Sequence, residues 1–467
     1  MDARLRATPF VRRRALETGS TSTHQSTAGA NVPATLLDPG ALRFWFAIVL
    51  TGLAAGLGGA LLTALLKEVQ LISWGTSDPA EIGNAARQAT AFRHIALLIS
   101  AGLVTGAGQW LLTRLASANS IETTAAIWFH AGRLPTFRTL GSAVLSIVIV
   151  AIGAPLGREG GPKEAGAVFG NLFSSLQKLS DDQRRLLVAI GAGAGMAAVY
   201  SVPPGGALFA LEVLRGILSL RLVLPALAAT TIATETATFV IPNAPIYPTP
   251  AYAITPGVFV FALLASPLIG LWSVGFVRAI SWADGVRPSG WRRLVAPPLV
   301  FLAIGAASIP FPQLLGNGQD VVQLLIREPL APLALLILLP LRPLVTVAAF
   351  GSGAPGGLFT PSLTAGALMG SALGALWLWI HPGGDIGVFA LLGAGALVAA
   401  TTQGPISTLV MMMELTGHAR EFALPMLTAI VVATVTARLV ERRSIYEARL
   451  TDQEVAARAR VRDATGV

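Results

Sequence analysis

Long stretches without a charged residue are the dominant pattern along this chain. They cover residues 44–66, 95–113, 186–211, 236–277 and 391–413. A helix needs about 20 consecutive apolar residues to cross the hydrocarbon core of a bilayer, and several of these stretches reach that length. The pattern therefore predicts an all-α polytopic membrane protein. The alternative is a soluble protein with a very large core.

Composition supports the membrane interpretation. The chain is 53% hydrophobic and 12% charged, and this charged fraction is about half of the roughly 25% that soluble domains carry. The net charge of +9 would indicate nucleic-acid binding in a soluble protein, but here arginines cluster near residues 4–14 and 442–462. The positive-inside rule then predicts cytoplasmic termini and an even number of crossings, with no nucleic-acid partner.

The order of segments predicts two membrane halves. Residues 1–40 are polar and form a flexible cytoplasmic segment in this interpretation, and residues 242–256 form a proline-rich linker without helical periodicity. The linker separates a first half, residues 41–241, from a second half, residues 257–446. Only a charged cytoplasmic tail, residues 447–467, follows, so we expect no appended soluble regulatory domain.

The two halves repeat one another. Residues of the stretch 153–170 recur 200 positions later, namely Gly153, Ala154, Pro155, Gly157, Ala165, Gly166, Ala167 and Gly170. A second set recurs 202 positions later, and it includes Gly191, Pro203 and Glu212, which match Gly393, Pro405 and Glu414. Internal duplication is typical of transporters, whose sites lie between the repeats. The halves are inverted if each has an odd number of crossings.

A burst of charge lies inside the first repeated stretch. Arg158, Glu159, Lys163 and Glu164 follow the charge-free residues 139–157. Charges at membrane depth are costly and by default mark a pathway or a site. The structural alternative is an ion pair between Glu159 and either Arg158 or Lys163.

Four prolines after small or β-branched residues predict helices that begin inside the membrane. Each is expected near the first helical position, where proline is favoured: Pro162, Pro203, Pro361 and Pro405. Such helix starts expose free N–H groups and the positive end of the helix dipole. Converging starts would form an anion site, whereas ordinary proline kinks would not.

Several segments resemble the CLC family of chloride channels and transporters across residues 42–450. They are GREGGP at 157–162, PPGGALFALEVLRG at 203–216, LGNGQDVVQ at 315–323, GSGAPGGLFTP at 351–361 and RSIYEARL at 443–450. Gly161 stands where the family pattern has proline. The resemblance implies a homodimer in a prokaryotic plasma or inner membrane, without CBS domains. Each subunit would be an inverted repeat of short tilted helices with its own pathway for chloride or a similar small anion.

The resemblance also implies roles for single residues. Glu159 matches the gating glutamate, whose carboxylate occupies the external anion site when ionised and leaves it when protonated. The backbone N–H groups of Leu358 and Phe359 match the ligands of the central anion, and Gly160 belongs to the same anion-binding set. Tyr446 matches a hydroxyl donor at the inner end of the pathway, although a tyrosine near a membrane boundary is also a common interfacial anchor.

Two family positions depart from the pattern. The central serine normally lies in Gly-Ser-Gly-Ile-Pro, but residues 116–128 lack that sequence. Ser117 and Ser120 are candidates and Asn119 is a further donor, so the preferred anion stays open. Val213 replaces the inner proton-transfer glutamate, while Glu212 and Glu414 are expected to be structural. Both passive channel and proton-coupled exchanger therefore remain open.

A membrane-embedded enzyme is the alternative functional class. It would use Glu159 or Glu164 as an acid or base inside the membrane. The histidines are scattered, and the sequence contains neither HExxH nor GxSxG. The chain has no cysteine, which excludes thiolate metal sites and a cysteine nucleophile. We therefore expect no enzyme, no metal and no cofactor.

Overall fold

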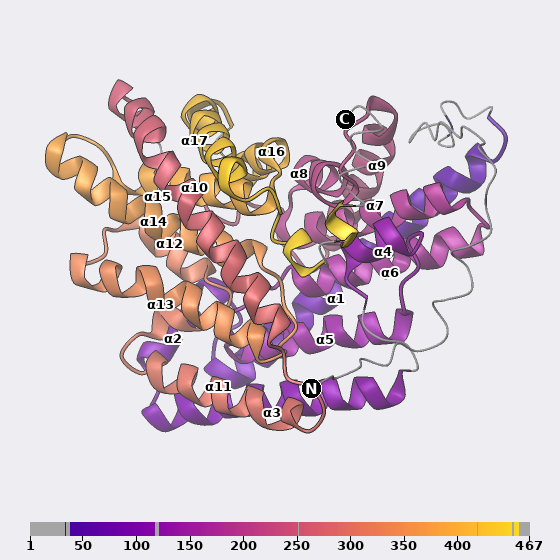
Figure 1. Ribbon diagram of the computed structural model, residues 1–467, viewed down its shortest axis with the longest axis horizontal. Coiled ribbons are helices and arrows are strands. Elements are labelled where there is room, and N and C mark those ends of the chain that lie inside the picture. The colour runs from indigo at the N-terminus through magenta and orange to yellow at the C-terminus, as the bar shows by residue number, and fades with distance from the viewer. Residues whose placement is uncertain are drawn as a thin grey trace, which may run out of the picture.

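The computed structural model describes residue 33 and residues 38–116, 121–250, 252–417, 419–450 and 453–456. Helices make up its regular structure in these residues, together with one isolated β-bridge. Figure 1 shows the first half, indigo to magenta, mostly on the right and the second half, orange to yellow, mostly on the left. At the bottom of this view α3 (Ala91–Leu115) of the first half packs against α11 (Arg292–Ser308) of the second.

The helices of the first half are mostly shorter than a full membrane crossing. They are α1 (Ala41–Trp74), α2 (Ile82–Arg87), α3 (Ala91–Leu115), α4 (Thr123–Phe129), α5 (Thr136–Ile152), α6 (Gly160–Leu176), α7 (Asp181–Tyr200), α8 (Pro203–Leu208), the π-helical turn η2 (Phe209–Arg215) and α9 (Leu220–Ala237).

The second half follows the same order of helices. It contains α10 (Pro256–Gly285), α11 (Arg292–Ser308), α12 (Gln319–Arg327), α13 (Pro332–Gly351), α14 (Phe359–Ile380), α15 (Ile386–Thr402), α16 (Pro405–Thr416) and α17 (Ala419–Val440). Short 3₁₀ turns complete the chain: η1 (Pro79–Glu81), η3 (Pro312–Leu314) and η4 (Glu447–Arg449).

The repeat predicted from sequence is present in three dimensions. The pair α6–α7 packs as α14–α15 does, and α1 contacts α9 as α10 contacts α17. Matching helices also pack against each other across the two halves, α3 on α11 and α8 on α16. The molecule is an inverted repeat, and its matching elements meet where the halves join.

Two of the long apolar stretches are not single helices. Residues 186–211 bend at Ser201 and residues 391–413 bend at Gln403, where both backbones are left-handed, with φ of 55° and 59°. A left-handed residue ends each helix, and Pro203 or Pro405 begins the next one. The apolar pattern alone does not reveal such a break, because both helices remain buried.

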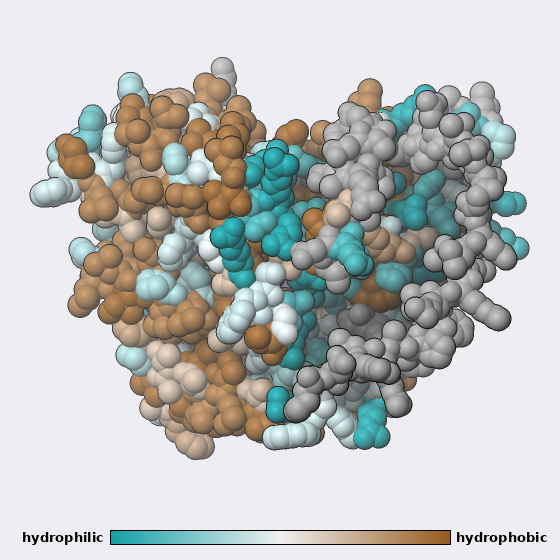
Figure 2. Space-filling model, viewed as in Figure 1, coloured by the Kyte–Doolittle hydropathy of each residue, from teal (hydrophilic) through white to brown (hydrophobic). Residues whose placement is uncertain are grey.

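Exposed apolar side chains cover much of the outer surface of the fold. Six helical stretches of the described residues are long and apolar enough to cross a membrane; they begin at α1, α3, α10, α13 and α14 and within α17. Large apolar side chains point outward from them, for example Leu61, Leu264 and Leu336, each at least 60% exposed. Figure 2 shows this as broad brown areas, especially over the second half. The chain is a polytopic membrane protein, as predicted.

Glycines allow the repeated helices to approach closely. A Cβ atom on Gly166 of α6 would overlap the carbonyl oxygen of Gly191 on α7. A Cβ atom on Gly191 would in turn overlap the carbonyl oxygen of Gly166. Gly366 and Gly393 make the same mutual contact between α14 and α15. Small residues at such contacts let membrane helices pack backbone to backbone. This packing explains why these glycines recur in both halves.

Candidate functional site

The two repeated glycine segments meet at one backbone bridge. Gly157 and Gly357 exchange both N–H···O hydrogen bonds, each at 2.8 Å between N and O. These residues are equivalent in the repeat, being 200 positions apart. Two residues that are equivalent in the repeat can exchange hydrogen bonds with each other only if they lie on the pseudo-twofold axis that relates the two halves. The bridge therefore joins the chain leading to α6 to the chain leading to α14.

The Glu159 carboxylate lies at the start of α14. Its Oε1 accepts the backbone N–H of Phe359 at 2.7 Å and that of Thr360 at 3.4 Å. Its Oε2 accepts hydroxyl groups from Tyr200 at 3.0 Å and Thr360 at 2.9 Å. A helix N-terminus with free N–H groups is an anion-binding site. An anionic side chain of the other half occupies that site here.

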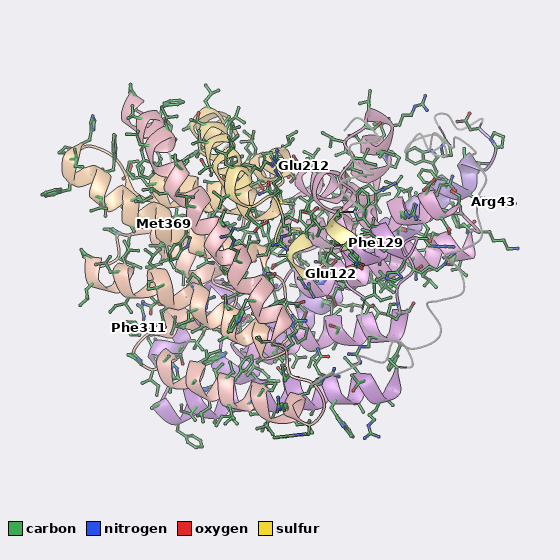
Figure 3. The ribbon with its side chains drawn as sticks, in the orientation of Figure 1. Arg43, Glu122, Phe129, Glu212, Phe311 and Met369 are labelled. Atoms are coloured by element: carbon green, nitrogen blue, oxygen red, sulfur yellow. The ribbon has the colours of Figure 1, made fainter. Side chains whose placement is uncertain are left out.

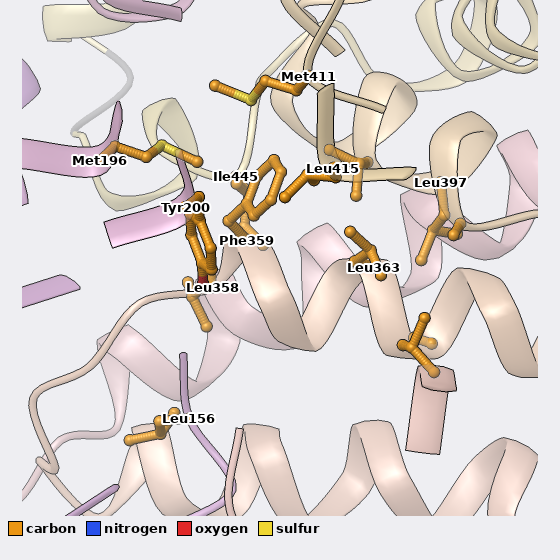
Figure 4. Close-up of a cluster of buried hydrophobic side chains, with 14 of the residues drawn as sticks. Leu156, Met196, Tyr200, Leu358, Phe359, Leu363, Leu397, Met411, Leu415 and Ile445 are labelled. Atoms are coloured by element: carbon orange, nitrogen blue, oxygen red, sulfur yellow. The ribbon is translucent and has the colours of Figure 1, made fainter. Parts of the chain in front are cut away.

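Tight walls hold this carboxylate in place. Glu159 is only 2% exposed, and a Cβ atom on Gly157 or Gly357 would overlap its carboxyl group. The Tyr200 ring lies beside the Phe359 ring, with centroids 6.1 Å apart, and Figure 4 shows both among apolar side chains that include Leu358 and Ile445. A buried carboxylate in such surroundings requires hydrogen-bond donors, which α14, Tyr200 and Thr360 supply.

The two neighbouring cations contact aromatic rings. The Arg158 guanidinium lies 5.2 Å from the centre of the Tyr200 ring, and the Lys163 ammonium lies 4.7 Å from the centre of the Tyr446 ring. The described residues contain no ion pair between Glu159 and either cation. The geometry thus differs from the structural ion pair considered as an alternative.

The remaining predicted ligands lie close to this centre. Leu358 is the residue before α14, and Gly160 opens α6, where a Cβ atom would stand 2.6 Å from the Gly357 nitrogen. Tyr446 is 4% exposed and packs edge-on against Phe209, with ring centroids 5.7 Å apart. The structure therefore brings Glu159, Gly160, Leu358 and Phe359 together, with Tyr446 linked to them through Lys163 on α6.

The starts of α6 and α14 differ from the prediction by two residues. Pro162 and Pro361 occupy the third helical position, because α6 begins at Gly160 and α14 at Phe359. Proline is tolerated there because the first four N–H groups of a helix have no partner within the helix. The consequence is functional: the two N–H groups before Pro361 remain free to bind Glu159.

The four helix starts do not converge on one anion, which corrects the prediction. The start of α16 binds Glu212, whose oxygens accept Ile406 N–H at 3.1 Å and Ser407 N–H at 2.7 Å. The start of α8 binds Glu414, which accepts Gly205 N–H at 2.7 Å. Each glutamate thus caps the helix of the opposite half, and Figure 3 shows Glu212 between the halves.

This reciprocal capping bears on the inner proton position. Val213 is 4% exposed and follows Glu212 in η2. A valine side chain has no proton to exchange, and the adjacent carboxylate of Glu212 already accepts two backbone N–H groups. Ser117, Asn119 and Ser120, the candidates for the central polar ligand, lie outside the described residues.

Sequence reasoning missed three residues of the centre. Thr360 directly follows Phe359, and Lys163 belongs to the charge burst that also contains Glu159. Those two had a readable signal in the sequence. Tyr200 had none, since it ends α7, 41 residues from Glu159. Only the packing of α7 against α6 brings its hydroxyl to the carboxylate.

Comparisons with known proteins agree with this architecture. A family model described as voltage gated chloride channel matches residues 102–438. The voltage-gated ClC-type chloride channel ClcB of Salmonella typhi is 30% identical over 410 residues, covering 84% of this chain and 96% of that protein. The putative chloride channel protein ClcB-like of Ralstonia nicotianae is 29% identical, covering 84% of this chain and 94% of that protein.

A solved structure shows the same fold. The crystal structure of a slow cyanobacterial Cl⁻/H⁺ antiporter superposes with a TM-score of 0.76 and 24% sequence identity, covering 90% of this chain and 99% of that one. A eukaryotic CLC transporter superposes with a TM-score of 0.70 at 18% identity, covering 87% of this chain and 73% of that one. The inverted helical repeat is thus an architecture already known from solved membrane proteins.

Proposed function

This chain belongs to the voltage gated chloride channel family, CLC, and we propose that it moves chloride across a membrane along a pathway gated by Glu159. The protein is a channel or transporter and not an enzyme. The single observation that carries the gating role is the position of the Glu159 carboxylate, which accepts the Phe359 and Thr360 N–H groups at the start of α14.

The gate follows from competition between two anions. An ionised carboxylate and a chloride ion need the same N–H donors, so the bound carboxylate closes the site. Protonation removes the charge that these donors favour, and the side chain then leaves the site to chloride. Anion binding and proton binding are coupled through one residue in this scheme.

Two forms of transport are compatible with such a gate: passive permeation of chloride and exchange of chloride for protons. Val213 and the occupied carboxylate of Glu212 favour passive permeation, because neither offers a free inner proton acceptor. The similarity in fold to a cyanobacterial Cl⁻/H⁺ antiporter favours exchange. We propose further that the protein is a homodimer with cytoplasmic termini, and that residues 41–241 and 257–446 are its two halves.

Reconstituted protein tests the function directly. Liposomes loaded with chloride should release it when a potassium ionophore supplies the counter-ion path, and the rate should rise as the pH falls. An imposed chloride gradient then distinguishes the two forms: uphill proton movement indicates exchange, whereas rapid chloride flux without proton movement indicates a channel.

Glu159→Gln tests the gate itself. The neutral amide imitates the protonated acid, so chloride release should persist or rise and should no longer depend on pH. Glu164→Gln is the matched control and should keep the pH dependence, because this neighbouring carboxylate on α6 accepts no hydrogen bond from α14 among the described residues. A Glu159→Gln protein that responds to pH as the wild type does would remove Glu159 from the gating role.

A further inference from the structure

A basic cavity lies beside the proposed anion pathway. It has a volume of about 210 Å³ and is lined by α3, α5, α6, the start of α11 and the chain before α14. Four arginines face it: Arg138, Arg287, Arg293 and Arg449. Glu159, Phe359 and Tyr446 are absent from its lining. The cavity therefore adjoins the centre at Gly356 and Glu164, but the gate itself does not line it.

Positive charge in this cavity is not balanced by the protein. Glu164 is the one acidic residue in its lining, and Asp284 is shared between Arg287 at 3.2 Å and Arg449 at 3.5 Å. Arg138 and Arg293 have no ion pair within the described residues. Four guanidinium groups thus face two carboxylates, which leaves an excess of positive charge.

Arg138 is the most informative of these side chains. It is only 8% exposed, it has no hydrogen-bond partner among the described residues, and it is close enough to Arg293 for mutual repulsion. Burying an unpaired charge is costly, and repulsion from the partly buried Arg293, whose Nε donates to the Pro288 carbonyl at 3.2 Å, adds to the cost. An anion between Arg138 and Arg293 would offset both costs.

The other two arginines are held rigidly at the cavity wall. The Arg287 guanidinium lies 4.0 Å from the centre of the Phe350 ring, and that of Arg449 lies 5.4 Å from it. Guanidinium groups fixed in this way lose little freedom on binding, and their planar donors match phosphate oxygens in bidentate geometry. The chemistry of the cavity favours a tetrahedral oxyanion of the phosphate type over a bare halide.

An apolar groove continues from the cavity. Its volume is about 470 Å³, and it shares Arg287, Pro288 and Ser352 with the cavity. Its other walls are mainly apolar and include Trp282, Val286, Trp291, Val295 and Leu299. Trp282 and Trp291 are 67% and 71% exposed, as expected for side chains at a membrane interface.

We propose that the cavity binds a phosphate group and that the adjoining groove makes an anionic phospholipid its source. The headgroup phosphate would lie between Arg138 and Arg293, and an acyl chain would lie along the groove between Trp282 and Trp291. Basic pockets between membrane helices bind lipid headgroups by this chemistry. This site requires neither the gate nor chloride transport, so it goes beyond the proposed function.

Native mass spectrometry of the purified full chain tests the site with phosphatidylglycerol as the probe. The wild type should retain bound phosphatidylglycerol in mild detergent. Arg138→Gln combined with Arg293→Gln should weaken retention at least about tenfold, because both charge-assisted contacts to the phosphate would be lost. Arg114→Gln combined with Arg221→Gln is the matched control, because both arginines are exposed and line neither the cavity nor the groove.

Inorganic phosphate distinguishes the two sources of a phosphate group. If phosphatidylglycerol is retained and Trp291→Gln weakens its retention but not the binding of inorganic phosphate, the lipid assignment is supported. Arginine-dependent binding of inorganic phosphate with no lipid retention would overturn the lipid as source. Equal lipid retention in the wild type, the cavity variant and the control would overturn the site. Arg293→Gln alone repeats the test if the double variant does not fold.

Discussion

The segments 153–170 and 353–370 share a backbone but differ in chemistry. Both turn at a left-handed glycine, Gly153 and Gly353, both bridge through Gly157 and Gly357, and both open a glycine-packed helix. The first segment carries four charged residues and the second carries none. Glu159 corresponds to Phe359 in the repeat, and the carboxylate of one binds the N–H of the other.

This difference shows how two segments with the same backbone can form one asymmetric site, because only their side chains differ. The second segment contributes fixed backbone donors, which keep their positions because they belong to a helix. The first contributes a side-chain carboxylate, which we propose moves when it is protonated. In contrast, Glu212 and Glu414 keep the symmetry of the repeat and cap each other's helices. At these two pairs of positions, the symmetric contacts are structural and the asymmetric one lies where an ion is proposed to bind.

The largest effect on chloride release should come from moving the Glu159 carboxylate out of its site while leaving Glu159 itself unmutated. In Gly357→Ala the three atoms nearest to the new Cβ atom all belong to the Glu159 side chain, so the carboxylate should leave the start of α14. The bonds lost are charge-assisted and worth roughly 1.5–3 kcal/mol each, so chloride release near neutral pH should rise about tenfold or more. Liposome efflux measures this.

Two further substitutions sharpen that result. Gly157→Ala should behave in the same way, since its Cβ atom also meets the Glu159 carboxyl group. Gly275→Ala on α10, where nothing lies within 4 Å of the new atom, should leave efflux unchanged. If Gly157→Ala and Gly357→Ala both showed wild-type efflux, the proposal that these two glycines make room for a closed Glu159 gate would be wrong.

Removing the fixed cation should have the next largest effect. Lys163→Leu gives the first segment the residue that the second has at Leu363, and it removes the ammonium group beside Tyr446. Two unit charges several ångströms apart interact by roughly 2–4 kcal/mol at an effective dielectric constant of about 20. Chloride affinity measured by calorimetry should fall about tenfold or more, whereas Lys178→Leu, two residues beyond the end of α6, should not change it. Equal affinities in the two variants would show that Lys163 does not act on the anion.

The symmetric pair should affect stability and not transport. Glu212→Gln weakens two bonds to backbone N–H groups and Glu414→Gln weakens one, so unfolding should become easier by about 1–3 kcal/mol in each case. Thermal unfolding in detergent measures this loss. The ratio of protons to chloride moved should stay as in the wild type, and a changed ratio would assign a proton-carrying role to the altered glutamate.

The smallest effect should come from Tyr200→Phe. Its hydroxyl donates one of several hydrogen bonds to the ionised Glu159 carboxylate, and such bonds favour the ionised form. Without it the carboxylate is protonated more readily, so the midpoint of the efflux–pH curve should move to higher pH. Tyr252→Phe, which loses a hydroxyl bound to the Ile326 carbonyl, is the control and should leave the midpoint in place. A shift to lower pH in Tyr200→Phe would contradict the hydrogen-bond assignment.

Local patterns in the sequence were sufficient for the membrane class and the duplication, and they marked the charged residues around Glu159 as a candidate site. Apolar length decides whether a segment prefers lipid, and the isolated charges of residues 158–164 mark a costly exception whatever the fold. The recurrence of Gly157 as Gly357 and of Glu212 as Glu414 is visible as letters alone. These features depend on residues that are adjacent or at a constant offset.

Tertiary structure alone decided which groups meet. The prolines predicted four equivalent helix starts. In the folded chain the start of α16 binds Glu212, the start of α8 binds Glu414 and the start of α14 binds Glu159. Tyr200 reaches the gate, and Arg138 comes to face Arg293, through contacts between helices far apart in the chain. A hydrogen bond or a charge contact depends on distance in space, and folding of the two halves around their shared axis sets that distance.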